Sequence, residues 1–498
     1  MYNYNQLIFP SYMEKDTRFF VIAGFSLNGP VDTPFSIRDG VDPIEVLGDC
    51  RMAENYLMAK EYGITPLLLR LNGSHGECEI NHEELNTPAL RFKTAEATDE
   101  SNNIHIHLFP SYMIIEGVYN SFSYFYSDYK TLDELVSAIK NELYFGKGEV
   151  DVEIVNPVPI QGLCLNELYV AMDGADDGFN YVSQFDDSDS EEKVALQLEI
   201  LKNNILDEVA DYAQFTGELS GFQIDTLLFT DIPFEKSPIE LPRILGQFAA
   251  AKTDEQIGFC SIVLSSDFFS DNRFDEESND TYISGVQYLL DNAPTGKTDS
   301  YLKHVEVVLG TQESVNASRL TMPCAASYAC MRYSLPDYYT SATNKGINSI
   351  SSLISTELKQ EEVAKLSSSG YICIVPSIIK GFVPFSSRSL YPKTSIYSKP
   401  HYLRSIYFDV DRIVSYFEPY IGESFSLMTI QSLLSQIKSF LDKLLDKHPI
   451  YKNITLEIMD YGEEYLKLSS SFELYGEIES VRSSFEYVPT NEVVITWQ

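Results

Sequence analysis

The sequence predicts an α/β chain of several domains, with a layered α/β core built from N-terminal, middle and C-terminal segments, an inserted small β domain and extended terminal β arms. Three observations predict it. Strand-like and helix-like segments alternate between residues 193 and 334, short strands dominate residues 76–158, and a long amphipathic helix precedes two alternating strands after residue 430. With 498 residues, 44% of them hydrophobic, the chain is long enough for two to four independently folding domains.

The N-terminal region divides into an arm and the first part of the core. Residues 1–18 are rich in Tyr and Asn and have no hydrophobic core of their own, which predicts an extended arm. Residues 19–75 contain a strand that ends in a Gly-Pro turn, a second short strand, an amphipathic helix over Met52–Lys60 and an apolar strand that ends in Asn-Gly.

Residues 76–158 are predicted to form the inserted β domain. Short segments with strand character lie at 90–92, 104–108 and 150–155, and one helix is expected over Leu132–Leu143. Thr131 precedes this helix and acidic residues occupy its first turn, as is typical of a helix start.

The middle domain is predicted over residues 159–385. Its segment from Asp173 to Glu192 holds eight acidic residues and no basic one, which indicates a solvated loop. The alternating elements that follow predict a largely parallel sheet covered on both faces. Helices are expected at 193–212, 241–252, 282–291 and 323–332, and strands at 224–229, 257–264 and 304–309.

The C-terminal domain is predicted over residues 386–485. Apolar residues recur at three- and four-residue spacing from Ile430 to Leu445, which predicts an amphipathic helix that ends before Pro449. Two alternating strands follow, at 455–459 and 465–475. The last segment, 486–498, is predicted to be a β arm with no pairing partner nearby in the sequence, so it needs the edge of another sheet.

Composition and charge exclude several functional classes. The formal net charge is −37, from 73 acidic and 36 basic residues, which argues against direct binding of nucleic acid or anionic membrane. No apolar run is long enough to cross a bilayer and the N-terminus lacks the order of a signal peptide, so synthesis in the cytoplasm is expected. Seven cysteines without a pairing pattern predict buried, reduced thiols. The expected partners are proteins.

Three groups of residues invite a ligand-binding interpretation. The run from Asp291 to Thr298 is close to a P-loop but lacks its first Gly, and a strand is expected after Lys297 where a phosphate-binding helix would be needed. His75, Cys78, His82, His105 and His107 fall within a short range, but one Cys with dispersed His is a weak metal pattern. The run from Asp173 to Gly178 lacks the ligands of a calcium loop.

An interpretation without a ligand is preferred for each group. The first is read as a surface turn, the second as polar residues of the inserted domain and the third as a solvated acidic loop. No Ser-His-Asp order, nucleophile elbow or catalytic carboxylate pair is recognisable. The sequence therefore predicts a chain that is not an enzyme and that has no cofactor and no metal.

The order of several blocks along the chain resembles contractile tail sheath proteins. The resemblance is carried by AGFSLNGPVDTP at 23–34, Leu47-Gly48, LLLRLNG at 67–73, an Ala-rich helix at 325–329, FVPFSSRSL at 382–390, the segment 404–413, YIGE at 420–423 and the 433–445 helix. Ser389 stands where the family usually has Thr. The resemblance covers nearly the whole chain and is strongest at both ends.

The resemblance implies a structural subunit that polymerises as six-fold helical rings around the tail tube and contracts to drive the tube through the host cell envelope for genome delivery. The implied partners are other copies of the chain, the tail tube protein, and the baseplate and tail terminator proteins. The implied location is the sheath of a virion tail, assembled in the host cytoplasm. The sheath of a bacterial phage-tail-like injection system and a soluble α/β enzyme remain the alternatives.

In such sheaths the terminal arms add strands to the sheets of neighbouring subunits, the C-terminal domain lies nearest the tube and the inserted domain points outward. The exchange arms of this chain would therefore be residues 1–18 and 486–498. Lys438, Lys443 and Lys447 form the polar side of the C-terminal helix and are the candidate tube-facing residues, against the simpler interpretation of a solvated helix face. The candidate arm residues are Tyr2, Tyr4, Leu7, Ile8, Phe9, Tyr487, Val493, Val494, Ile495 and Trp497.

Overall fold

The computed structural model divides the chain into two parts, which are described separately. The first comprises Met1–Pro336 and Thr340–Pro400, and the second comprises Asp337–Tyr339 and His401–Gln498. No helix among the described residues is long and apolar enough to span a bilayer. The structure describes residues 6–9, 18–26, 29–30, 33–71, 77–94, 104–117, 121–146, 150–172, 190–205, 219, 221–256, 258–267, 273–276, 281–294, 297–314, 322–353, 358–417, 427–461, 466–475, 483–488 and 492–497.

A seven-stranded sheet forms the centre of the first part, with strand order β21-β20-β16-β13-β12-β2-β4. All neighbouring strands are parallel except β21, which is antiparallel to β20. The largely parallel sheet predicted from the alternation of strands and helices is therefore confirmed. The strands are β2 Phe19–Gly24, β4 Leu67–Arg70, β12 Ile224–Phe229, β13 Ser261–Ser266, β16 Val305–Leu309, β20 Tyr371–Ser377 and β21 Gly381–Pro384.

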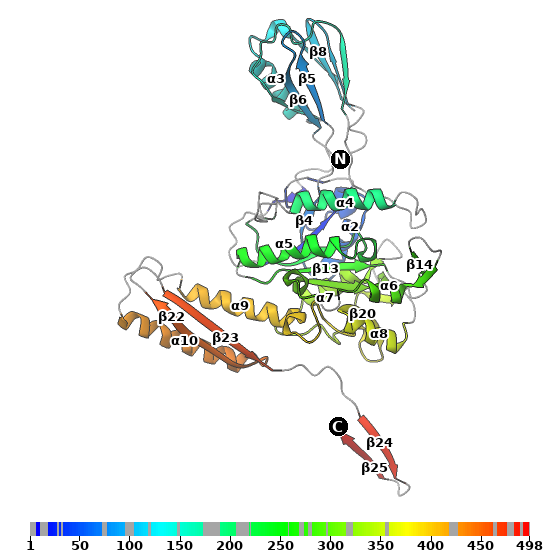
Figure 1. Cartoon of the computed structure of the whole chain (residues 1–498), viewed down its shortest axis with the longest axis vertical. Coiled ribbons are helices and arrows are strands. Elements are labelled where there is room, and N and C mark those ends of the chain that lie inside the picture. Colours follow the sequence, from blue (N-terminus) through cyan, green and yellow to red (C-terminus); the bar gives the residue numbers. More distant parts are fainter. Residues whose placement is uncertain are drawn as a thin grey trace. The chain divides into compact units, whose positions relative to one another are not determined.

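Two hydrophobic clusters lie on opposite faces of this sheet because side chains alternate along each strand. Leu227 and Val307 belong to one cluster, whereas their neighbours Leu228 and Val308 belong to the other. Figure 1 shows α5 and α7 on opposite sides of β13. The first face is covered by α4 Ser190–Ile205, α5 Glu240–Gln256, α6 Gly285–Asp291 and α8 Gln360–Ser368, and the second by α1 Pro43–Leu47, α2 Arg51–Glu61 and α7 Cys324–Tyr333.

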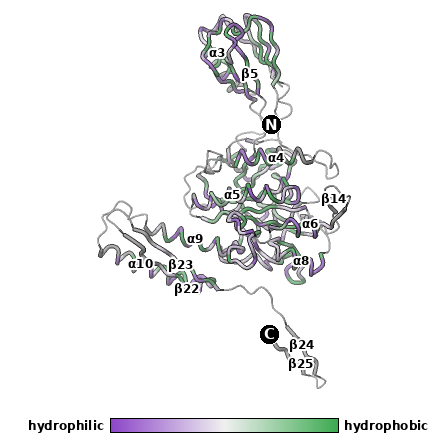
Figure 2. The backbone as a smooth tube through the Cα atoms, in the orientation of Figure 1, coloured by the Kyte–Doolittle hydropathy of each residue, from purple (hydrophilic) through white to green (hydrophobic). Residues whose placement is uncertain are grey.

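Local sequence explains how these helices begin and pack. Asp42 caps α1 by accepting a hydrogen bond from the Ile44 N–H, and Ser284 caps α6 in the same way. The small residues of α7 are fully buried, so this helix approaches the sheet closely. Along α4 and α5, hydrophilic and hydrophobic residues alternate, as Figure 2 shows.

Short elements complete the first part. β1 pairs with β3, β14 with β15, and β17 with both β18 and β19, all antiparallel. The seven cysteines are buried free thiols, as predicted, and burial raises the pKa of Cys50 and of Cys373 to about 12. The bounds are β1 Leu7–Ile8, β3 Ser36–Ile37, β14 Arg273–Glu276, β15 Thr281–Ser284, β17 Thr311–Ser314, β18 Met322–Pro323, β19 Ile350–Leu353, η4 Phe234–Lys236, η5 Ser300–His304 and η6 Ile396–Ser398.

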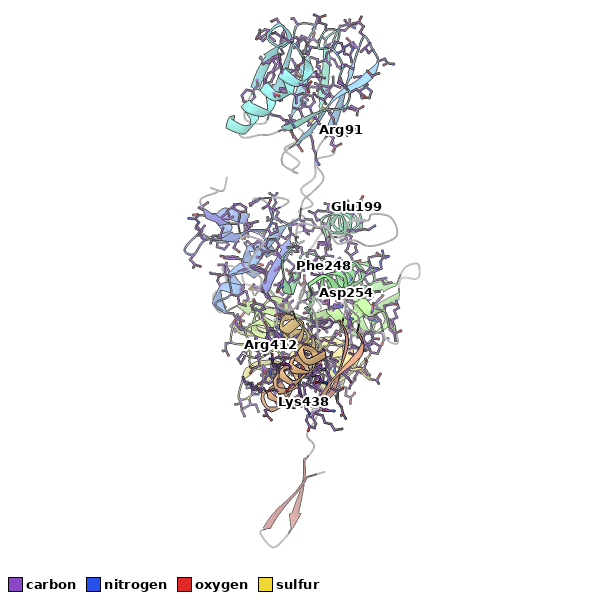
Figure 3. All side chains as sticks on the ribbon, turned by 90° about the vertical axis from the view of Figure 1, so that its left-hand side faces the viewer. Arg91, Glu199, Phe248, Asp254, Arg412 and Lys438 are labelled. Atoms are coloured by element: carbon purple, nitrogen blue, oxygen red, sulfur yellow. The ribbon has the colours of Figure 1, made fainter. Side chains whose placement is uncertain are left out.

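Residues 77–172 form two antiparallel sheets and one long helix around a separate hydrophobic cluster. The three-stranded sheet has the order β10-β6-β5 and the four-stranded sheet has the order β11-β7-β8-β9. Arg91, labelled in Figure 3, pairs across the first sheet with Glu79 and Glu153. The elements are β5 Glu77–His82, β6 Thr87–Thr94, β7 His105–Leu108, β8 Tyr112–Glu116, β9 Ser121–Phe125, η3 Tyr126–Asp128, α3 Leu132–Gly146, β10 Val150–Ile154 and β11 Leu168–Ala171.

This region extends beyond residue 158, where the sequence predicted its end. β11 pairs with β7, and Ile160, Leu163 and Met172 lie in the same cluster as the preceding strands. The β11 segment has only four residues and one partly buried side chain, Val170, so it carries little alternation for sequence analysis to detect. The remaining predicted domain boundaries stay predictions.

The described residues of the second part form two long helices and two antiparallel sheets of two strands each, β22-β23 and β24-β25 (Ser483–Val488 and Glu492–Trp497). α9 spans Pro400–Phe417, α10 spans Leu427–Lys447, and β22 Tyr451–Tyr461 pairs with β23 Leu466–Leu474. The amphipathic C-terminal helix and the two strands after it are thus confirmed, whereas α9 was not predicted. The small core contains Ile413, Ile437, Leu441, Leu444, Tyr451 and Ile454.

Candidate assembly surfaces

The N-terminal arm is partly held by its own chain. β1 pairs with β3, Leu7 is buried, and Arg38 Nε donates a hydrogen bond to the Leu7 carbonyl (3.2 Å). Ile8 and Phe9 are exposed, at 46% and 43%. Of the candidate arm residues, Leu7 is therefore a core residue in this structure, whereas Ile8 and Phe9 are exposed. Tyr2 and Tyr4 lie outside the described residues.

The C-terminal arm does have a partner nearby in the sequence, which corrects our expectation. β24, Ser483–Val488, pairs antiparallel with β25, Glu492–Trp497, so that Tyr487 lies opposite Val493. Val494, Ile495 and Trp497 belong to the same hairpin. The Pro-Thr-Asn sequence at 489–491 is a turn signal that would have predicted this pairing.

The terminal hairpin forms a sheet of only two strands in the described structure. Each strand pairs along one edge, so the backbone groups on the outer edges have no ladder partner within that sheet. A two-stranded hairpin is at best marginally stable in water. Its outer edges are therefore candidates for pairing with another sheet.

The three candidate tube-facing lysines lie on the exposed face of α10. Lys438, labelled in Figure 3, is exposed, as are Lys443 and Lys447. The opposite face carries the buried residues of the small core. Asp442 and Asp446 share the exposed face with the lysines. The face is therefore of mixed charge, with a basic excess of one over these five residues.

A strongly exposed apolar hairpin tip was not recognised from the sequence. Ile378 and Ile379 connect β20 to β21 and are exposed at 106% and 91%. Lys380 follows them and donates a hydrogen bond to the Asn344 carbonyl (2.7 Å). The pair is exposed because it forms part of the turn between the two strands. Two adjacent exposed isoleucines on one loop are typical of a contact surface.

The position where α/β enzymes bind ligands is filled here by the chain's own groups. In doubly wound sheets that position lies at the carboxyl ends of the strands, where the chain order reverses, here between β2 and β12. The Phe25 N–H donates to Asp231 Oδ2 (2.6 Å). Arg51 donates to Asp267 Oδ2 (2.6 Å) and to the Thr230 carbonyl (2.7 Å). These contacts tie the strand ends together.

The carboxyl groups at this edge have raised pKa values because they are desolvated. Burial raises the pKa of Asp231 to about 6 and that of Glu235 to about 7, and the neighbouring Asp267 contributes to the second shift. Sequence reasoning missed this group because its members follow strands that are distant in the chain. The available signal was an Asp one or two residues after each of two buried strands.

A buried charged network lies under α7. Arg332 pairs with Glu306, which also accepts a hydrogen bond from Tyr328 Oη (2.6 Å), and Arg332 Nη2 donates to Thr226 Oγ1 (2.7 Å). Burial and the adjacent Glu306 raise the pKa of Tyr328 well above its usual value. These groups bond to one another inside the core, which indicates a structural role, although Arg332 Nε has no hydrogen-bond partner among the described residues.

The P-loop-like run has the wrong order of elements for nucleotide binding. The helix α6 ends at Asp291, the first residue of the run, and the chain after Lys297 forms the 3-10 helix η5 and then β16. A P-loop needs a strand before the loop and a helix after it. The prediction of a strand directly after Lys297 is thus wrong, because the 3-10 helix Ser300–His304 comes first and β16 begins only at Val305.

The histidines and Cys78 of the weak metal pattern lie on different sheets. His82 is buried on β5, with Nε2 3.0 Å from the carbonyl oxygens of both Pro159 and Gln161, and Cys78 lies on the same strand. His105 and His107 lie on β7 of the other sheet. Among the described residues no group of three metal-ligating side chains is arranged to hold an ion. His75 and the acidic run from Asp173 to Gly178 lie outside the described residues.

Comparison with known proteins gives a result for structure and none for sequence. No protein-family model matches the chain, and no curated protein matches its sequence. A chain of the anti-feeding prophage baseplate in its contracted state is similar in structure, with a TM-score of 0.51 and 11% identity over 99% of this chain and 98% of that chain.

Two sheath tail proteins are also similar. The one from Desulfitobacterium hafniense has a TM-score of 0.47 and 11% identity over 98% of both chains. The one from Listeria innocua has a TM-score of 0.44 and 12% identity over 91% of this chain and 95% of that chain. The likeness to the baseplate chain, with its TM-score of 0.51, confirms the α/β multidomain fold that was predicted from the sequence. By fold, the chain is an α/β multidomain protein similar to that chain of the anti-feeding prophage baseplate.

Proposed function

We propose that the chain is a structural subunit of a contractile tail sheath. It polymerises with other copies as six-fold helical rings around a tail tube, and contraction of the rings drives the tube through the host cell envelope. The observation that supports this most directly is the terminal β24–β25 hairpin, a two-stranded sheet with outer edges free to pair. The likeness of fold to a chain of a contractile assembly supports it independently.

The terminal arms would connect subunits by β-augmentation. Backbone hydrogen bonds, each worth about 0.5–1.5 kcal/mol net, add up along a strand and over many subunits. On the N-terminal side the proposed arm is residues 1–18, in which Ile8 and Phe9 are exposed and Leu7 is packed within its own subunit. On the C-terminal side it is the β24–β25 hairpin.

The arm proposal is tested by removing single backbone donors from β25. Successive N–H groups of a strand point to opposite edges, so either Val493→Pro or Val494→Pro removes a donor from the outer edge. The matched controls are Val493→Thr and Val494→Thr, which keep the donor and the β-branched shape. Negative-stain electron microscopy of the purified chain should reveal tubes or stacked rings that are lost in one proline variant and kept in both controls. Assembly by all four variants would refute arm exchange.

We propose further that the exposed face of α10 contacts the tube protein through Lys438, Lys443 and Lys447. The support is the basic excess of this face in a chain of net charge −37. Changing the three lysines to Glu should prevent assembly around purified tubes and leave the sheath's own rings intact. The matched control changes Asp442 and Asp446 to Asn. If the triple variant still assembles around the tube, the proposed contact between the α10 lysines and the tube protein is refuted.

A phage tail and a bacterial injection system are the two settings for such a sheath. We propose the phage tail, with the baseplate and tail terminator proteins as further partners, the virion as location and no catalytic activity. The likeness to a chain of the anti-feeding prophage favours an injection system as the second candidate. Particles purified from the producing cells decide between the two, since only phage particles carry a head filled with DNA.

A further inference from the structure

The solvent-facing side of the four-stranded sheet β11-β7-β8-β9 is aromatic rather than polar. Antiparallel sheets with one face on a core usually turn polar side chains to water. Here Phe109, Tyr112 and Phe125 form one transverse row: Tyr112 lies opposite Phe125, and the Phe109 N–H donates to the Tyr112 carbonyl (2.9 Å). The neighbouring transverse row crosses all four strands and consists of Tyr169, His107, Ile114 and Ser123. We call these two rows, together with His105, the aromatic face.

The rings of the aromatic face touch one another. Phe109 and Tyr112 are stacked with centroids 4.5 Å apart, and Tyr112 and Phe125 are 5.6 Å apart. The Tyr169 ring lies 4.9 Å from His105 and 4.5 Å from His107. Such contacts hold the rings in place before any ligand binds, which reduces the ordering that binding requires.

The rings are open to solvent. Tyr169 and Phe125 are 53% and 52% exposed, and Phe109, Tyr112 and Ile114 are partly exposed. The alternate residues of the same strands, such as Ile106 and Met113, are fully buried in the domain core. The aromatic residues are therefore not needed to fill this core. Contiguous exposed apolar residues of this kind mark a binding surface.

Polar groups lie at the edges of the rings. His107 Nε2 is 3.2 Å from Glu116 Oε2, and Glu116 is exposed beside Ser121 and Ser123. The face thus offers flat rings together with hydroxyl, imidazole and carboxylate groups. A protein interface core is depleted of charged groups, so this mixture fits a ligand that has its own polar rim.

The net charge of the domain formed by residues 77–172 indicates which class of ligand the aromatic face binds. Between residues 77 and 172 there are sixteen Asp and Glu against five Lys and Arg, and the acidic Glu116 borders the aromatic face opposite His105. Nucleic acids and anionic lipid surfaces need clustered Lys and Arg, so they do not match. An uncharged ligand is favoured.

We propose that the aromatic face binds a neutral polysaccharide. A pyranose ring has an apolar C–H side that packs on an aromatic ring and a rim of hydroxyl groups that hydrogen-bond to imidazole and carboxylate. From β11 to β9 the face spans three strand separations, about 14 Å, which suits a run of linked sugars rather than a single one. This inference does not depend on sheath assembly.

The test uses the full-length chain. Native gels that contain dextran, mannan, galactomannan or amylopectin, and an array of bacterial surface and cell-wall oligosaccharides, are the probes. The variants are Tyr112→Ala and Tyr169→Ala. The matched control is Leu165→Ala, which removes a 54% exposed apolar side chain of the same region that lies before β11 and outside the aromatic face. Thermal unfolding verifies that all variants fold.

We expect at least one neutral polysaccharide to retard the chain, with affinity reduced on the order of tenfold or more in each Tyr variant and unchanged in the Leu165 variant. No retention by any gel or array member overturns the proposal. So does equal retention of all variants. If the Tyr variants instead lose self-assembly and none binds glycan, the face is an interface between copies and the glycan assignment is wrong.

Discussion

At the residue scale, charged side chains buried in the main core pair with one another. Arg332 and Glu306 are almost fully buried, and they form further hydrogen bonds with Thr226 and Tyr328, respectively. A buried ion pair adds little net stability compared with apolar residues, but loss of one partner leaves an uncompensated charge. The pair therefore restricts how α7 can pack on the sheet.

This restriction predicts an asymmetric response to mutation. Arg332→Met should lower the free energy of unfolding by about 3–5 kcal/mol because Glu306 is left buried and unpaired. The double variant Arg332→Met with Glu306→Leu should recover much of that loss. Urea unfolding followed by circular dichroism measures both. A single variant no less stable than the double one would contradict the argument.

Glu235 predicts a pH dependence of stability. Its pKa is raised to about 7 by burial and by the facing Asp267. The folded chain therefore binds a proton that the unfolded chain releases above its ordinary pKa, so this stabilisation is present at low pH and is lost as pH rises through about 7. Glu235→Gln should stabilise the chain at pH 8 by on the order of 1 kcal/mol and have little effect at pH 4. Thermal unfolding at both pH values tests this, and an equal shift at both would contradict it.

At the element scale, sequence periodicity predicted helices and strands that are buried on one face and strands that are buried on both faces. β12 was predicted with its observed bounds and α10 over most of its length, from Ile430 rather than Leu427, because a continuous apolar run and a three-to-four spacing are strong local signals. α9 was missed although it is amphipathic, since its Arg and Tyr residues obscured the spacing. β24 was missed because its pairing depends on a turn that was not recognised.

The candidate sites were harder to predict than the elements. The aromatic face arises from the register of four strands, and the carboxyl groups at the switch point come from ends of strands far apart in sequence. Neither is visible in a local pattern. The lysines of α10 were correctly placed on an exposed face because one helix contains them all.

The β20–β21 hairpin gives a prediction that separates folding from assembly. Ile378 and Ile379 are almost fully exposed, so changing both to Ser should alter the free energy of unfolding by no more than about 0.5 kcal/mol. If the tip contacts another copy, the same variant should self-associate less. Sedimentation velocity measures association, and Lys380→Ser is the control for the loop itself. Unchanged association would exclude the tip as a contact.

At the scale of the whole molecule, net charge opposes assembly. Each copy carries 73 acidic and 36 basic residues, so copies brought together repel one another over distances comparable with the screening length, about 10 Å at 0.1 M salt. The contacts that join copies in our proposal are backbone pairing and apolar side chains, which salt does not weaken in the same way. Added salt therefore weakens the repulsion between copies more than it weakens the contacts that join them.

Self-association should consequently increase as salt is added. Raising NaCl from about 0.01 M to about 0.2 M shortens the screening length from about 30 Å to less than 10 Å and reduces the repulsion between copies. The fraction of chain in tubes or rings, measured by sedimentation and electron microscopy, should rise over this range. Sucrose at matched osmolality controls for exclusion of solutes and should have a smaller effect. If the assembled fraction instead falls as salt is added, ion pairs between copies outweigh the repulsion. The exposed face of α10, which carries both Lys and Asp, would then be the first surface to test for such ion pairs.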